Sequence, residues 1–154
     1  YDFFNSPSYV QDVDLEGRPT AMTSTNGGNA VTDLRLAGGD DVTVYVGGLS
    51  NAAAVADHLR GKEESTYFVA AGSSGKPSPE DLAGALYIAR HLHGNPPTDE
   101  ERAVYREQVA FAKGPKYEDK PPLKRTDLYE YALDLDSRDV VPKLEGQKLY
   151  DASA

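Results

Sequence analysis

Two adjacent carboxylates, Glu80 and Asp81, are the side chains of this sequence best suited to metal or acid–base chemistry. Carboxylate oxygens are hard ligands of the kind that Mg²⁺ prefers, and a carboxylate can also act as a general base. Both residues stand in the first turn of a predicted helix, where acidic side chains also stabilise the positive end of the helix dipole. The pair is therefore a candidate catalytic and magnesium-binding site, with a purely structural role in the helix as the alternative.

Three loops rich in glycine and serine could bind a small anion through their backbone amides. They lie at 26–29, 47–50 and 72–77, and the candidate ligand-binding residues in or beside the first two are Thr25, Asn26, Gly27, Ser50 and Asn51. Glycine lets a backbone approach an oxyanion closely, and helix N-termini attract anions. Tight turns are also rich in glycine and serine, so each loop has a structural alternative. None is a nucleotide-binding P-loop, because 72–77 has the wrong spacing and a proline where the hydroxyl belongs.

The elements that must position these groups are predicted from a threefold alternation. Residues 20–25, 42–46 and 66–71 read as strands, and each is followed by a small-residue loop and then by helical periodicity. This order is typical of a parallel sheet, in which ligands bind beyond the carboxyl ends of the strands. We therefore expect an α/β fold, with a predominantly parallel sheet flanked by helices in three layers.

The remainder of the chain is predicted to be mainly helical. Helices are expected at about 51–60, 79–93, 98–113 and 126–134, and a terminal hairpin at 140–150. Ser78 and Pro79 favour the start of the second of these helices, and Gly94 favours its end. A length of 154 residues suits one domain, so we expect a single α/β domain over 1–154 with a helical C-terminal portion.

Composition excludes several classes of function. The formal net charge is −9, which disfavours nucleic-acid binding, and the chain has no cysteine for thiolate metal sites or nucleophiles. The three histidines show no His-Glu-x-x-His spacing, so zinc hydrolase chemistry is unsupported. No apolar run is long enough to span a bilayer. We expect an acidic cytoplasmic protein whose partner is a small anionic phosphate or sulfonate, with no nucleic acid or membrane partner and with homo-oligomerisation left open.

Several sequence blocks occur in a fixed order. They lie at 2–7, at 23–30 (Thr-Ser-Thr-Asn-Gly-Gly-Asn-Ala), at 50–56, at 71–72 with 80–85, and at 139–142. In this order they resemble the Mg²⁺-dependent 2-phosphosulfolactate phosphatases of coenzyme M biosynthesis, most closely over residues 1–94. The resemblance implies hydrolysis of 2-phosphosulfolactate to sulfolactate and phosphate. It adds Asn5 and Ser6 to the substrate-binding candidates Thr25, Asn26, Gly27, Ser50 and Asn51, with Glu80 and Asp81 as catalytic and metal-binding residues.

Two departures from the family pattern leave an alternative open. Phe4 replaces a glycine, and Gly28-Asn29 stand where the family has a threonine and usually a basic residue. The resemblance also implies an upstream block, so the chain is expected to be about the C-terminal two-thirds of a longer phosphatase and to be inactive alone. The alternative function is a non-catalytic anion-binding or assembly domain, whose helical tail at 98–139 packs against a partner.

Overall fold

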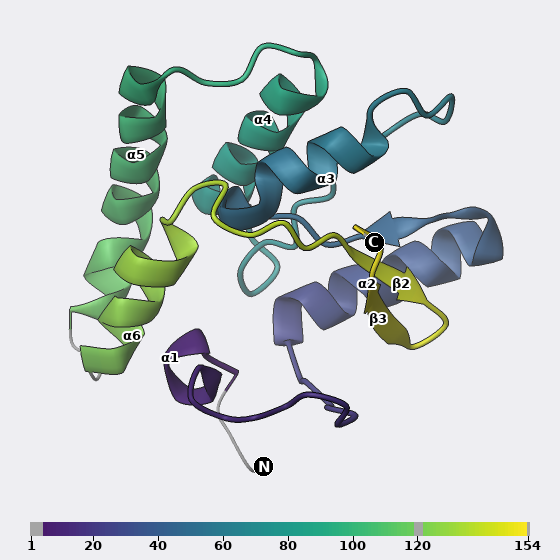
Figure 1. Ribbon diagram of the computed structural model, residues 1–154, viewed down its shortest axis with the longest axis horizontal. Helices are drawn as coiled ribbons and strands as arrows, with labels where there is room; N and C mark the ends of the chain where they lie inside the picture. The colour runs from purple at the N-terminus through teal and green to yellow at the C-terminus, as the bar shows by residue number, and fades with distance from the viewer. Residues whose placement is uncertain (1–4, 119–121, 154) are drawn as a thin grey trace.

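The fold is built mainly from helices. The computed structural model (Figure 1) describes residues 5–118 and 122–153, and its structure is 51% helical. The helices are α1 (Pro7–Val10), α2 (Thr25–Gly38), α3 (Ala52–Leu59), α4 (Pro79–Leu92), α5 (Asp99–Tyr117) and α6 (Pro122–Thr126), with short 3₁₀ turns η1 (Gly39–Asp41) and η2 (Leu49–Asn51) and a π-helical turn η3 (Asp127–Ala132). The prediction of a helical C-terminal portion is thus confirmed.

The sheet is small and antiparallel. Its strands are β1 (Val44–Tyr45), β2 (Pro142–Glu145) and β3 (Lys148–Asp151), in the order β1-β2-β3. Val44 pairs with Leu144, so the central strand comes from the end of the chain. The predicted terminal hairpin is confirmed, whereas the prediction of a predominantly parallel sheet in three layers was wrong.

Two of the three predicted strands do not form ladders. Residues 20–24 have no regular structure, and Thr25 already belongs to α2; residues 66–71 are likewise irregular. The side chains of Tyr67 and Val69 are 84% and 53% exposed, so no packing surface supports an alternating pattern there. β-prone side chains specify a strand only where a neighbouring strand accepts the backbone hydrogen bonds, and that partner is not encoded locally.

The hydrophobic core lies where α3, α4 and α5 meet the C-terminal segment. Ala52 and Ala56 on α3 are fully buried, and such small side chains let α3 cross close to α4 (Figure 1). Tyr87 on α4 is also fully buried, and its ring contacts that of Tyr105 edge-on at a centroid distance of 5.0 Å. Val141, just before β2, completes this core and joins the sheet to the helices.

Local sequence accounts well for the two long helices. Thr98 and Glu101 form a capping box at the start of α5, with the Glu101 amide donating to Thr98 Oγ1 and the Thr98 amide donating to Glu101 Oε2. Arg90 of α4 pairs with Glu101 at 2.7 Å, which sets the end of α4 beside the start of α5. The two helices therefore run antiparallel, and the start of α4 lies beside the end of α5.

Candidate functional site

The N-terminus of α4 holds a glycine turn against one of the predicted catalytic carboxylates. The Gly72 amide donates to Asp81 Oδ2 at 2.7 Å. Gly72 has φ +73°, and a Cβ there would lie 2.6 Å from the carbonyl oxygen of Lys76, so the turn requires glycine at this position. The Ser73 amide closes the turn by donating to that same carbonyl at 2.8 Å. Asp81 thus fixes the loop of residues 72–76 on the first turn of α4.

The N-terminus of α2 meets the same loop. The Ser74 amide donates to Asn26 Oδ1 at 3.4 Å, and Thr25 and Gly27 flank Asn26 in the first turn of α2. Two of the three predicted anion-binding loops are therefore brought together with both predicted carboxylates. We call Asn26, Gly72, Ser74, Glu80, Asp81 and Lys113 the α2–α4 cluster.

Lys113 was not among the sequence candidates. It lies in the C-terminal part of α5 and forms an ion pair with Glu80, whose side chain is only 12% exposed. Burial opposes ionisation of Glu80, but the contacts with Lys113 and Ser78 more than offset it, so the pKa of Glu80 falls below its ordinary value. Only the antiparallel packing of α4 on α5 reveals this lysine, because the two residues are 33 positions apart.

Ser50 and Asn51 lie elsewhere, at the start of α3. Asn51 is buried, and its amide group donates to the carbonyls of Val46 and Val140, while its Oδ1 accepts from the Gly48 amide at 2.8 Å. The carbonyl of Ser50 accepts from the Arg138 amide. These bonds tie the segment after β1 to the segment before β2, so the side chain of Asn51 is engaged in holding the fold.

Asn5 and Ser6 contact a third region. Ser6 is 3% exposed, and its hydroxyl donates to Asp127 Oδ2. The Ser8 amide donates to the other oxygen of Asp127 at 3.0 Å, so one carboxylate of η3 caps α1. Asn5 donates to the carbonyl of Thr23 at 3.1 Å, close to the start of α2. Within the described ranges, no hydrogen bond or ion pair joins Ser6 to the α2–α4 cluster.

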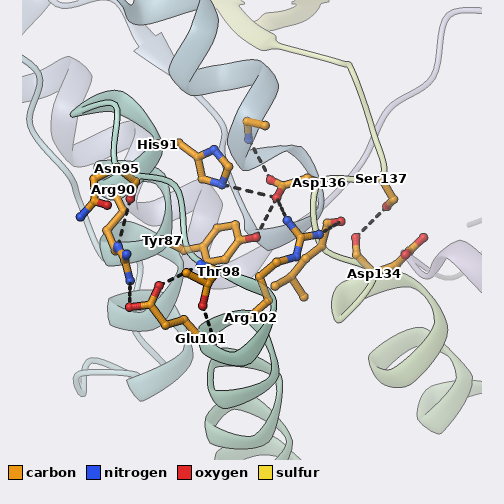
Figure 2. A network of polar contacts seen from close by, with 12 residues as sticks. Tyr87, Arg90, His91, Asn95, Thr98, Glu101, Arg102, Asp134, Asp136 and Ser137 are labelled. Atoms are coloured by element: carbon orange, nitrogen blue, oxygen red, sulfur yellow. Dashed lines mark hydrogen bonds and ion pairs between the residues drawn. The ribbon is translucent and has the colours of Figure 1, made fainter.

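A buried polar network surrounds Asp136, a residue that the sequence did not single out (Figure 2). Tyr87 and Arg102 each donate to Asp136 Oδ2 at 2.7 Å, and the Ala53 amide donates to Oδ1 at 3.0 Å. His91 Nε2 lies 3.4 Å from the same Oδ2. Burial, followed by the contact with Asp136, raises the pKa of the Tyr87 hydroxyl well above its ordinary value. The network joins α3, α4 and α5 to the C-terminal segment.

Metal-binding potential is limited in the part of the chain that the structure describes. Over residues 5–118 and 122–153, no three His, Cys, Asp or Glu side chains gather in a way that could hold a metal ion. No helix in these ranges is both long and apolar enough to cross a membrane. A metal at the α2–α4 cluster would therefore depend on few protein ligands and on oxygens supplied by a substrate.

Comparison with curated proteins finds relatives that share a name. The chain is 36% identical over 95 residues to a "Probable 2-phosphosulfolactate phosphatase" of Clostridium perfringens, covering 62% of this chain and 37% of that protein. It is 28% identical over 106 residues to the protein of that name from Thermotoga petrophila, covering 69% and 44% respectively. A third, from Symbiobacterium thermophilum, is 36% identical over 90 residues, covering 58% and 37%.

The matched stretch thus spans less than half the length of these relatives. No solved structure matches the chain significantly. The family model described as 2-phosphosulpholactate phosphatase matches residues 1–147, which is nearly the whole chain. The family expected from the order of the sequence blocks is therefore confirmed, and the chain belongs to the 2-phosphosulpholactate phosphatase family.

Proposed function

We propose that this chain carries part or all of a phosphatase site for a small anionic phosphomonoester, with 2-phosphosulfolactate as the substrate that its family implies. The observation that carries the proposal is the α2–α4 cluster. There two helix N-termini, a glycine turn, a lysine and two carboxylates meet through the contacts of Asp81, Asn26 and Glu80. Helix N-termini and a nearby ammonium are groups that stabilise phosphoryl oxygens.

The proposal gives the two carboxylates different roles. Glu80 faces Lys113 and is held ionised, so it serves to place the ammonium beside the start of α4. Asp81 uses one oxygen for Gly72, and among the described residues its other oxygen has no hydrogen-bond partner. Lys113 would offset negative charge on the phosphoryl group as water adds to phosphorus and the ester oxygen leaves with a proton.

Mg²⁺ remains part of the proposal at Asp81. This ion commonly takes only one or two protein carboxylates together with oxygens of a substrate phosphate and water. Asp81, whose second oxygen has no hydrogen-bond partner among the described residues, fits that requirement, whereas the charge of Glu80 is already paired with that of Lys113. When bound, the ion would supply charge neutralisation at the phosphoryl oxygens. The finer expectations of coenzyme M biosynthesis and a cytoplasmic location belong to this same proposal.

The test is phosphate release from 2-phosphosulfolactate, measured against Mg²⁺ concentration, for the chain and for D81N and K113Q. We expect D81N to raise the Mg²⁺ concentration needed for half-maximal rate by at least about tenfold, because one charged ligand is lost. K113Q should raise KM for the substrate without changing that Mg²⁺ requirement.

Matched controls come from exposed residues outside the cluster. Asp57 lies on α3 and Lys148 on β3, so D57N and K148Q make the same charge changes and should leave both parameters unaltered. Phosphate release that D81N leaves intact would overturn the proposal, and so would the absence of both phosphate release and saturable substrate binding. Saturable binding of the substrate without turnover would instead favour the non-catalytic anion-binding domain.

A further inference from the structure

A second group of basic and phenolic side chains lies at the C-terminal end of α3. Lys62 Nζ is 3.3 Å from the Tyr45 hydroxyl and 3.2 Å from His58 Nε2, and His58 Nε2 is itself 3.3 Å from that hydroxyl. Lys143 joins them from β2, because it pairs with Tyr45 across the β1–β2 ladder. We call Tyr45, His58, Lys62 and Lys143 the α3 C-terminal cluster.

The charge of this cluster is not balanced. Lys143 is paired with Glu145 at 3.0 Å, and on α3 Asp57 is paired with Arg60 at 2.8 Å. Within residues 5–118 and 122–153, however, no carboxylate pairs with Lys62, whose neighbours are the imidazole, the phenol and the face of the Tyr45 ring. In a chain of net charge −9, an ammonium held only by neutral groups is a local excess of positive charge.

The pKa of His58 responds to the same excess of positive charge. Burial lowers the pKa of its imidazole below the ordinary value, and the charges of Lys62 and Lys143 lower it further. The groups that act on the imidazole are Tyr45 from β1, Lys143 from β2 and Lys62 from the loop after α3. A bound anion would reverse this effect, because it would screen the lysines and favour the imidazolium form.

We propose that the α3 C-terminal cluster is a binding site for a small tetrahedral oxyanion of the sulfate or phosphate type. Lys62 Nζ and the Tyr45 hydroxyl lie within hydrogen-bond distance of each other and each can donate to an oxyanion, and His58 becomes a further donor when it takes up a proton. This site is distinct from the proposed phosphatase site, since it lies at the end of α3 opposite Ser50 and Asn51 and shares no residue with the α2–α4 cluster.

The test is an NMR titration of the His58 ring in the 154-residue chain, followed from about pH 5 to 8. Sulfate is the probe, because it stays a dianion throughout this range, and chloride at equal ionic strength controls for screening. We expect sulfate to raise the His58 pKa saturably. By linkage, a tenfold preference of sulfate for the imidazolium form corresponds to a shift of about one pKa unit. His91 and His93 serve as internal controls in the same spectra and should not follow sulfate.

Variants make the result specific. Because Lys62 is exposed, K62Q should keep the fold, which far-ultraviolet circular dichroism checks. It should raise the His58 pKa in chloride by removing a neighbouring charge, and weaken sulfate binding by roughly tenfold. K148Q makes the same charge change outside the cluster and should leave sulfate binding unchanged. Equal shifts in sulfate and chloride, unaltered sulfate affinity in K62Q, or an unaltered His58 pKa in that variant would each overturn the proposal.

Discussion

Asp136 shows how much of this fold depends on one carboxylate. Its backbone lies in the left-handed region, with φ +53°, a conformation that few residues other than glycine adopt. Its side chain, 12% exposed, accepts from Tyr87, Arg102 and the Ala53 amide. Through these hydrogen bonds Asp136 holds three helices together with the segment that leads to β2.

We predict that D136N destabilises the chain by about 3 kcal/mol, because it leaves the guanidinium of Arg102 partly buried without its counter-charge. The free energy of unfolding from urea denaturation measures the effect. D134N is the matched control, since Asp134 and Arg138 are about half exposed and 3.9 Å apart, and it should cost less than about 1 kcal/mol. Similar losses in the two variants would show that the network adds no special stability.

At the level of single residues, sequence reasoning predicted the local features of the candidate site that depend on neighbours in the chain. The α4 N-terminus and its carboxylates are readable from Ser78, Pro79 and the acidic pair. Lys113 and Asp136 are not readable in this way, because their partners come from other elements. A lysine in a charged helix and an aspartate in a turn are each common, and only the packed structure gives them a role.

Among the elements, α1 depends on a contact rather than on its own length. Four residues are too few for a stable helix in isolation, and Asp127 of η3 supplies the cap. Burial opposes ionisation of Asp127, but the hydroxyl of Ser6, bonds from Ser8 and the charge of Lys124 together lower its pKa below the ordinary value. The docking of α1 on α6 and η3 is therefore linked to the charge of this one carboxylate.

The lowered pKa of Asp127 determines how the free energy of unfolding changes with pH. Stability from Asp127 is fully present above the ordinary aspartate pKa, about 3.9, and is lost as the pH falls through the lower folded value. We predict that D127N costs about 2 kcal/mol at neutral pH, and that this difference from the unmodified chain shrinks as the pH falls below about 4. Urea denaturation at a series of pH values measures it. D33N removes an exposed carboxylate from α2 and should show little effect at any pH; a constant D127N difference across the series would contradict the prediction.

Over the whole molecule, the long helices α4 and α5 and the terminal hairpin were predicted, whereas the pairing of that hairpin with β1 was not. The bounds predicted for the helices at 79–93 and 98–113 agree with those of α4 and α5 to within a few residues. They were predictable because caps and periodicity are local signals. The predicted strands at 20–25 and 66–71 failed because strand pairing is a property of distant segments. Proximity of the first and third loops was expected from a parallel sheet, yet the structure achieves it through helix N-termini and the turn at 72–76.

The net charge of −9 predicts how the rate of association with an anionic substrate depends on salt. A phosphomonoester approaching an acidic protein is repelled, and salt weakens that repulsion over a Debye length of about 10 Å at 0.1 M. We predict that kcat/KM for 2-phosphosulfolactate rises as sodium chloride is increased from low to physiological concentration. Steady-state kinetics at fixed Mg²⁺ measures this, with sodium acetate in a parallel series to separate screening from specific chloride effects. A fall in kcat/KM would show that attraction by local cations such as Lys113 outweighs the overall charge.

The pairing of Val44 with Leu144 makes the sheet the slowest part of the molecule to assemble. Closing a loop of this size costs conformational entropy before any ladder bond repays it, whereas α4 and α5 form from contacts between neighbours. During synthesis on the ribosome, β1 emerges about a hundred residues before its partner, at roughly 5–20 residues per second. During those seconds the backbone N–H and C=O groups of Val44 and Tyr45 have no strand partner. In this state they can pair with a strand of another chain.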